Sequence, residues 1–334
     1  MKLRKMIFMG KKFMRDFSAN RDLHANTDNA NGELRHYYIR FPLDIRKLNR
    51  QICGFDAEGI PLNASYIDVK TSGTYYYPIS IGQYGLAVFS RWLESGDTFY
   101  RDAFMRIAEW FALHAEEEEG EVWWRSDMPR AEYALFRPWK SAFAQSRGIS
   151  VLLRAWQMTG NGKYADLASG ALLPYAKDIA EGGVSVDGKS GKGRFYEEYA
   201  ADFPTRILDG HIFSLWGLYD YMRAVVSPEY ASSRDLARRL FEEGIKGLES
   251  RLPEYDTGCW MRFGICDLPG YPNEDPCTMG YMRLIRVQLR ITAALSGSAL
   301  LNTYADKIDA YMNIRGISGM IKYKIRALRR LDRI

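Results

Sequence analysis

The sequence predicts a mainly helical fold, an α/α toroid or barrel of about four helical hairpins, preceded by a short irregular or strand-containing segment. Helical periodicity dominates from Ile79 onward. Short turns between helices recur at residues 95, 159, 227 and 296, which are 64, 68 and 69 residues apart. Such an internal repeat is typical of helix pairs that stack and bury their apolar faces against one another.

Each repeat is a pair of antiparallel helices joined by a short turn that contains Gly, Ser or Pro. We expect the first helix of each pair on the inside of the toroid and the second on the outside. The predicted pairs are 79–93 with 98–119, 141–158 with 163–180, 210–225 with 229–251, and 280–295 with 298–313. The predicted organisation is an N-terminal arm with short strands over 1–70, a toroidal catalytic domain over 71–314 and a basic tail over 315–334.

Composition excludes several classes of protein. The 334 residues are 47% hydrophobic, which suits a full core, and no run of about 18 apolar residues predicts a membrane span. No convincing signal peptide is present, so we expect a cytoplasmic protein. The chain has a formal charge of +5, but residues 1–15 and 315–334 together carry +12 and leave −7 on the body. A basic globular face for nucleic acid is therefore not expected.

Metal-ligating residues do not form a recognisable motif. The Cys residues lack the paired spacing of a zinc site, and the four His residues are scattered. The acidic run 116–119 reads as a solvated helix end, and no EF-hand spacing supports calcium. We expect no metal and no cofactor. The Cys residues are expected to be reduced, or to form a disulfide within 259–277 if the protein is exported.

The basic tail is amphipathic. Met320, Ile321, Ile325, Leu328 and Leu331 fall near one face of a helix whose other face is rich in Lys and Arg. This pattern predicts either peripheral contact of the basic termini with an anionic membrane surface or a solvated tail that docks on the acidic body. The oligomeric state is not predicted.

The connections between the helix pairs are long and carry the functional argument. The returns 120–140, 181–209 and 252–279 each end where an inner helix begins, so they should line one cleft at one end of the toroid. Aromatic rings beside Arg and Glu are typical of a sugar site, because rings cover the apolar faces of a sugar and polar groups bind its hydroxyls. Each of these side chains has ordinary packing as its alternative role. The candidates in the first two loops are Trp123, Trp124, Arg125, Tyr196, Glu197, Glu198 and Tyr199.

Neighbouring Glu197 and Glu198 should point to opposite faces of an extended segment. At most one of them is expected to enter the cleft, and the other to make a structural hydrogen bond. Tyr196 would share a face with Glu198.

Six segments, collinear from about residue 54 to 295, resemble the C-terminal domain of the D-glucuronyl C5-epimerases of heparin and heparan sulfate biosynthesis. They are GIPL from Gly59, YYPISIGQYGL from Tyr76, SAFAQ from Ser141, YEEY from Tyr196, DGHIFSLWGLYD from Asp209 and LPEYDTG from Leu252.

The resemblance implies an α/α-barrel enzyme, an isomerase, that acts on uronic acids within a polysaccharide such as a glycosaminoglycan. The catalytic Glu-Tyr pair of the family falls on Glu198 and Tyr199, and its late catalytic Tyr falls on Tyr281, with Gln288 seven residues on. The matching segments add Gln83, Tyr84 and Gln145 as substrate-binding candidates. Three positions depart from the family: Phe263 stands in place of a functional Tyr, Cys266 in place of an Arg, and Met282 in place of a His.

Epimerisation at C5 needs a positive charge near the sugar carboxylate and two proton carriers on opposite sides of the ring. A Tyr can donate a proton or, once deprotonated, accept one, and a nearby guanidinium would stabilise the phenolate. We expect Tyr199 and Tyr281 to be the two carriers and Glu198 to orient or relay a proton. The candidate guanidinium groups are those of Arg206, Arg262 and Arg283.

Three other functions remain open on sequence grounds. A polysaccharide lyase would share the carbanion but expel the C4 oxygen. A glycoside hydrolase on an α/α toroid would use two carboxylates among Glu198, Asp202, Asp209 and Asp256. A non-catalytic glycan-binding protein would fit the Phe at position 263. Alternatively, Tyr271 could take the role of the Tyr that is absent at position 263.

Overall fold

The computed structural model describes residues 2–18, 32–66, 69 and 73–331. The described chain is mainly helical, as the sequence predicts, and the helix pairs follow one another in the expected order. Parts of the predicted arm and the last three residues of the predicted tail lie outside the described residues. The pairs are α3 (Pro78–Ser95) with α4 (Thr98–Leu113), α5 (Ala142–Thr159) with α6 (Gly162–Gly170), α7 (Leu208–Ala224) with α8 (Ala231–Tyr255), and α9 (Met279–Ser296) with α10 (Ala299–Tyr311).

Three of the four turns share one local structure. Gly96, Gly160 and Gly297 end the first helix of their pairs in the left-handed region, with φ of 68°, 70° and 76°. Glycine adopts this conformation without the steric cost that a Cβ atom brings. A polar side chain one residue later then accepts a backbone N–H hydrogen bond and starts the second helix, namely Asp97, Asn161 or Ser298.

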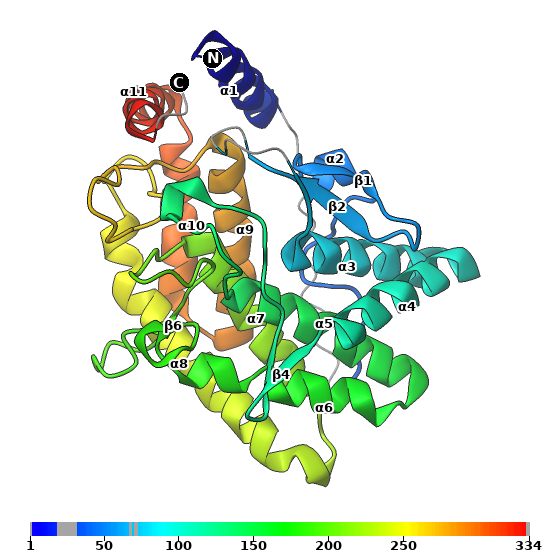
Figure 1. The fold of residues 1–334 in the computed structure, drawn as a ribbon. Helices are drawn as coiled ribbons and strands as arrows, with labels where there is room; N and C mark the ends of the chain where they lie inside the picture. Colours follow the sequence, from blue (N-terminus) through cyan, green and yellow to red (C-terminus); the bar gives the residue numbers. More distant parts are fainter. Residues whose placement is uncertain (1, 19–31, 67–68, 70–72, 332–334) are drawn as a thin grey trace.

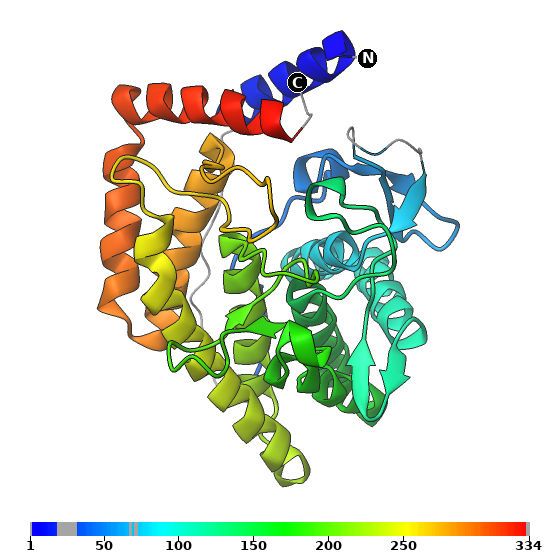
Figure 2. The ribbon, with the colours of Figure 1, turned by 60° about the vertical axis from the view of Figure 1, so that its left-hand side comes forward.

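The first helices of the pairs pack against one another in sequence order, α3 on α5, α5 on α7 and α7 on α9. Figures 1 and 2 show the pairs as an arc, with α3 and α4 at one end and α9 and α10 at the other. Helix α7 lies in the middle and is buried on nearly every side. The second helices each pack on their own partner, so the repeat produces one continuous core.

A segment near the N-terminus packs along the inner helices. The Tyr38 hydroxyl donates to Asp220 of α7 at 2.7 Å, and the ring of Tyr37 lies 5.8 Å from that of Trp216. Asp220 also pairs with Arg154 of α5 at 2.8 Å, and both side chains are fully buried. The buried ion pair therefore ties α5 to α7, and Tyr38 of this segment adds a hydrogen bond to it.

The short strands form three separate small sheets. One antiparallel sheet has the order β1-β2-β3, with β1 (Ile52–Phe55), β2 (Pro61–Ala64) and β3 (Thr74–Tyr76). Two-stranded sheets join β4 (Glu116–Glu118) to β5 (Glu121–Trp123), and β6 (Ser185–Val186) to β7 (Phe195–Tyr196). Short strands in the N-terminal arm agree with the prediction.

Three local predictions were wrong. The acidic run at 116–118 is strand β4, paired with β5, because Gly120 with φ of 82° allows a tight turn between them. Helix α6 is shorter than expected, and 3₁₀ turns at Leu173–Ala176 and Ile179–Glu181 replace its second half. The N-terminal arm contains α1 (Lys2–Ser18) and the short α2 (Ile45–Leu48), whereas only strands and irregular structure were expected. The basic tail forms the expected helix, α11 (Ile314–Arg330).

Candidate active site

Three segments that precede inner helices meet at one end of the arc. Tyr77 directly precedes α3, Trp139 lies just before α5, and Tyr199 lies in the loop before α7. Backbone hydrogen bonds join the last two segments, from Ala142 N to Glu197 O and from Ala200 N to Lys140 O. The ring of Trp139 lies 6.1 Å from that of Tyr77 and 5.2 Å from that of Tyr199. The long returns therefore converge as their positions in the sequence predict.

Four tyrosines form a contiguous cluster at this end, which we call the tyrosine cluster (Tyr77, Tyr133, Tyr199 and Tyr271). Tyr133 lies between two others, with its ring stacked 4.5 Å from Tyr199 and 5.9 Å from Tyr271. Tyr77 and Tyr199 share a side-chain hydrogen bond. Each of the three long returns supplies one tyrosine, and the start of α3 supplies the fourth. All four segments therefore contact one another at the cluster.

The guanidinium of Arg130 lies against this cluster. Its Cζ atom is 5.1 Å from the ring centroid of Tyr77 and 5.4 Å from that of Tyr199. Burial raises the pKa of Tyr199 well above its usual value, and the positive charge of Arg130 opposes that rise. Burial likewise raises the pKa of Tyr77 to about 12. Arg130 is the cation that the sequence analysis sought beside Tyr199.

Glu198 faces the same cluster. Burial raises its pKa to about 7, while a hydrogen bond from Tyr199 and the charge of Arg130 act in the opposite direction. A Cβ atom at Gly210 would lie 2.5 Å from the Cβ of Glu198, so the glycine in the first turns of α7 makes room for this side chain. Glu198 and Tyr199 each retain 7% exposure, whereas Tyr196 and Glu197 retain none.

Glu197 has the structural role expected for one of the two neighbours. Its Oε2 atom accepts hydrogen bonds from Thr205 N at 3.0 Å and from Arg206 N at 2.9 Å. The Thr205 hydroxyl donates to the same oxygen. Burial raises the pKa of Glu197 to about 7, and these donors oppose the rise. Glu197 therefore closes the loop that carries Tyr199.

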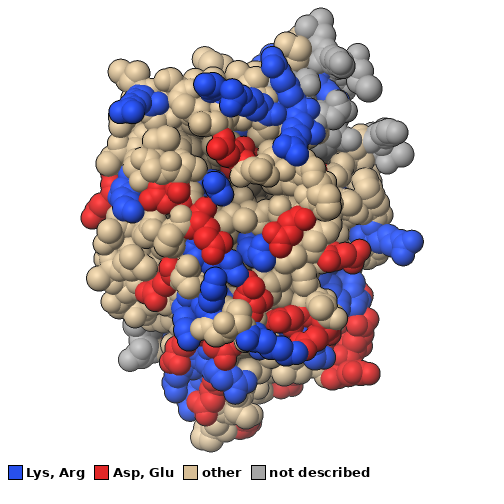
Figure 3. All heavy atoms as spheres, turned by 90° about the vertical axis from the view of Figure 1, so that its left-hand side faces the viewer, with Lys and Arg blue, Asp and Glu red and all other residues tan. Residues whose placement is uncertain are grey.

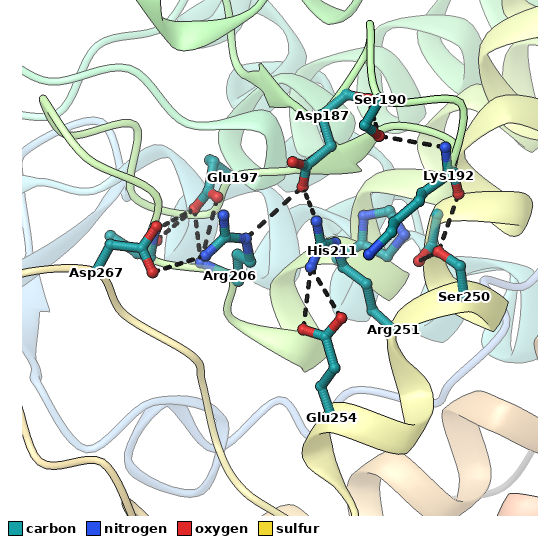
Figure 4. Close-up of polar contacts among 12 residues, drawn as sticks. Asp187, Ser190, Lys192, Glu197, Arg206, His211, Ser250, Arg251, Glu254 and Asp267 are labelled. Carbon is teal, nitrogen blue, oxygen red and sulfur yellow. Dashed lines mark hydrogen bonds and ion pairs between the residues drawn. The ribbon is translucent and has the colours of Figure 1, made fainter.

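Arg206 belongs to an internal network of charges, shown in Figure 4. Its guanidinium lies 2.9 Å from Asp267 and 3.7 Å from Asp187, and its backbone has a φ of 44°. Arg251 of α8 also pairs with Asp187. Since two carboxylates already neutralise Arg206, its place is in this network rather than beside the phenol of Tyr199.

His211 fixes the strand that leads into the site. Its Nδ1 atom accepts a hydrogen bond from Tyr196 N at 2.8 Å, and its Nε2 atom lies 3.1 Å from Gly244 O. Burial lowers its pKa to about 3, so the ring is neutral and donates from Nε2 to the carbonyl. The Tyr196 hydroxyl donates to Leu240 O of α8. Tyr196 and His211 thus hold β7 between α7 and α8.

Tyr281 lies in the first turn of α9 and is half-buried. Its ring lies 4.6 Å from that of Phe263 in an edge-to-face contact. Two turns further along α9, Gln288 donates to Asp209 O of α7 at 3.1 Å. Residues seven apart share a face of a helix, so Tyr281 lies on the side of α9 that faces α7, about 10 Å along the axis from the point where Gln288 meets Asp209.

Tyr271 also reaches the site from the third long return. Its hydroxyl donates to Asp275 Oδ2 at 3.1 Å, and Lys324 of α11 donates to Asp275 Oδ1 at 2.6 Å. Burial raises the pKa of Tyr271 well above its usual value. The tail helix is therefore linked to the tyrosine cluster through one buried carboxylate.

Several other predicted side chains lie in the core or on its edge. Trp123 and Trp124 are buried, and the Trp124 indole donates to Phe111 O at 2.8 Å, so neither ring lies on an exposed rim. Gln145 is fully buried and donates to Val122 O. Arg125 pairs with Glu116 and Glu118 of β4. Gln83 and Tyr84 of α3 are half-buried, as is Arg283 of α9.

Arg262 lines a cavity of about 90 Å³ beneath α11, together with Trp260 and Tyr323. A larger cavity, of about 510 Å³, lies beside the 3₁₀ turn at Ile179–Glu181 and is lined by Asp178, Asp187 and Asp202. Asp256, one of the carboxylates considered for hydrolysis, pairs with Lys307 at 3.1 Å. The four cysteines do not form disulfides.

The sequence analysis missed Tyr77, Arg130 and Tyr133 as site residues. Tyr77 lies inside the matching segment YYPISIGQYGL, and the other two lie in the first long return. The predicted cations, Arg206, Arg262 and Arg283, lie near Tyr199 or Tyr281 in the sequence, whereas Arg130 lies in the first long return.

Comparison with known proteins gives a family match that covers most of this site. The family described as the D-glucuronyl C5-epimerase C-terminus matches residues 118–310. A D-glucuronyl C5-epimerase of Caenorhabditis elegans is 33% identical over 165 residues, which are 47% of this chain and 26% of that protein. An uncharacterised protein of Methanocaldococcus jannaschii is 25% identical over 193 residues, which are 55% of this chain and 58% of that protein. The chain thus spans about a quarter to just over half of the length of these relatives.

Proposed function

Because this chain belongs to the D-glucuronyl C5-epimerase C-terminus family, we propose that it is an isomerase that inverts C5 of glucuronic acid residues within a polysaccharide. The observation that carries the proposal is the placement of Glu198, with a pKa of about 7, in a hydrogen bond with Tyr199. We also propose that the helix pairs form the predicted toroid and that this toroid surrounds the bound polymer.

Inversion at C5 breaks one C–H bond and forms another on the opposite face of the sugar. The electron pair of the broken bond is delocalised into the adjacent carboxylate, which is already negative, so a nearby cation lowers the barrier. Arg130 supplies a buried positive charge at the tyrosine cluster. Its charge stabilises both the intermediate and a transient phenolate on Tyr199.

Tyr199 takes the C5 proton as its own phenolic proton passes to Glu198. Burial raises the pKa of the Glu198 carboxyl toward neutrality, which suits a group that accepts a proton and returns it. Tyr199 itself stays protonated in the resting protein, since burial raises its pKa. After one turnover Glu198 holds the added proton and Tyr281 lacks one, and proton exchange with solvent restores both groups.

Tyr281 donates the proton to the opposite face. It faces α7 from the first turn of α9, and its edge-to-face contact with Phe263 fixes its ring. When iduronic acid is the substrate, Tyr281 becomes the base and Tyr199 the acid. Phe263 thus has a positioning role here, and catalysis does not require a phenol at that position.

Incubation with polymers that contain glucuronate, followed by NMR of the recovered polymer, tests the proposal. An epimerase yields iduronate without a change in chain length. An unsaturated sugar end that absorbs ultraviolet light would identify a lyase, and new reducing ends would identify a hydrolase. Binding without any product would identify a glycan-binding protein.

Two substitutions assign the activity to this site. We expect Tyr199→Phe and Tyr281→Phe each to lower the epimerisation rate by at least about 100-fold, because each removes a proton carrier. Tyr164→Phe is the matched control, since Tyr164 lies on α6 and its hydroxyl contacts Glu109 at 3.3 Å. Equal rates in all three variants would refute the assignment.

A further inference from the structure

The helices at the two ends of the described chain lie together over the end that carries the candidate site. Figures 1 and 2 show α1 and α11 side by side there, next to the first turn of α9. Lys324 of α11 donates to Asp275 and to Pro276 O, just before α9 begins. Helix α1 packs on α9. We propose that α1 and α11 form one docking surface for an anionic lipid bilayer, which holds the candidate site close to the membrane.

Helix α11 turns a basic face to solvent. Its inner face is formed by Gly316, Met320 and Ala327, which are buried. Its outer face exposes five Lys and Arg side chains and contains no acidic residue within the helix. Ile325 lies among these cations and is 40% exposed. The exposed basic side chains are Arg315, Lys322, Arg326, Arg329 and Arg330.

Helix α1 adds apolar side chains to the same surface. Met9 is buried and accepts a hydrogen bond from the Tyr66 hydroxyl, which fixes one face of the helix on the body. Ile7 and Met14, on the face opposite Met9, are 51% and 65% exposed, and Met6, on the flank of the helix, is 55% exposed. Exposed Lys11 lies one turn from Ile7. Three large apolar side chains this exposed on one short helix mark an interaction surface.

The net charge of the two terminal segments is opposite in sign to that of the rest of the chain. Residues 1–15 and 315–334 together carry +12, and the rest of the chain carries −7. In Figure 3 the end that holds the termini shows Lys and Arg among largely uncharged surface, while acidic and basic side chains are mixed over the middle and the opposite end. An anionic surface would therefore attract this end and repel the others, which orients the protein on approach.

The apolar side chains favour a bilayer over a soluble polyanion as the partner. A soluble polyanion is bound through Lys and Arg, and exposed Met and Ile contribute little to it. An amphipathic helix on a membrane uses both, because its apolar residues enter the acyl boundary and its cations contact lipid head groups. Within the described residues no helix is long and apolar enough to span a bilayer, so the contact lies in the plane of the interface.

Sedimentation with vesicles tests the proposal on the full chain. Vesicles of phosphatidylcholine are compared with vesicles that contain 30% phosphatidylglycerol. We expect the protein to sediment with the anionic vesicles only. The triple variant Lys322→Gln, Arg326→Gln, Arg329→Gln should weaken partitioning on the order of 100-fold, from about fivefold per charge. The triple variant Met6→Ser, Ile7→Ser, Met14→Ser keeps every charge and should weaken it by at least about tenfold.

A charge-matched control separates the surface from net charge. Arg101→Gln, Lys163→Gln, Arg238→Gln removes three exposed cations from α4, α6 and α8 and should leave partitioning unchanged. All the replaced side chains are exposed, so each variant should melt within a few degrees of the parent by circular dichroism. Normal partitioning of the apolar variant would overturn the proposal, as would an equal loss in the control. Retention on a soluble polyglucuronate column that depends only on the three cations would instead identify a polyanion site.

Discussion

Replacing Glu198 by Gln should make the protein more stable at pH 8 while it removes the proposed proton acceptor. In the folded protein burial raises the pKa of this carboxyl from 4.5 to about 7. Between these values the unfolded chain binds fewer protons than the folded one, so the free energy of unfolding falls as pH rises. The full difference corresponds to about 3 kcal/mol, and most of it falls between pH 5 and pH 8.

A Gln side chain cannot ionise and still accepts the hydrogen bond from Tyr199 through its amide oxygen. Between pH 5 and pH 8 the parent should therefore lose about 2–3 kcal/mol of stability that the variant retains. Urea denaturation at the two pH values measures this difference. The variant should also be inactive, so its gain in stability and its loss of function come from the same buried group.

Glu197→Gln is the matched control, because its neighbouring carboxyl also has a pKa of about 7. This substitution removes the same dependence on pH. However, the Arg206 N–H also lies 3.2 Å from Glu197 Oε1, so a Gln that keeps its oxygen in the place of Oε2 turns its NH2 group toward another donor. We expect a loss of about 1–3 kcal/mol at pH 5 that Glu198→Gln does not show. If Glu198→Gln loses as much stability between the two pH values as the parent does, the buried neutral Glu198 is refuted.

Three further substitutions test other parts of the account. Gly210→Ala places a Cβ atom 2.5 Å from that of Glu198, so we expect about 1–3 kcal/mol of destabilisation in urea and slower epimerisation; an unchanged midpoint would contradict the close packing. Arg130→Gln should slow C5 proton exchange by about 100-fold, measured by NMR, because it removes the cation beside the phenols; exchange as fast as in the parent would exclude its electrostatic role. Asp220→Asn leaves Arg154 buried without its counter-ion and should cost about 3–5 kcal/mol in urea, and a loss below about 1 kcal/mol would mean that the pair does not tie α5 to α7.

The helix pairs were predictable because their boundaries are local. Gly96, Gly160 and Gly297 each follow an amphipathic run and precede a capping residue, and all three end helices. The run 116–118 was misread because its pairing partner lies across a turn, and a string of Glu alone carries no strand signal. Helix α1 was missed because its basic sequence favours neither core packing nor a recognised motif.

Strand geometry predicted that one of Glu197 and Glu198 makes structural hydrogen bonds, and Glu197 does so. The same geometry paired Glu198 with Tyr196, which was wrong, because Glu198 bonds to Tyr199 and Tyr196 is buried against α8. Which of the two Glu residues faces the cluster was not predictable, because that depends on Thr205 and Gly210. Arg130 lies nearly 70 residues before Tyr199 in the sequence. Only the fold of the first and second long returns brings the two together, so no local pattern could pair them.

Solvent deuterium exchange at C5 tests the central claim most directly. The protein is incubated in deuterium oxide with a glucuronate polymer or with the same polymer enriched in iduronate. The parent should deposit deuterium at C5 of both sugars. Tyr199→Phe should block exchange mainly from glucuronate, and Tyr281→Phe mainly from iduronate, since each base serves one face. Absence of deuterium at C5 in the parent, with every polymer tested, would contradict the account.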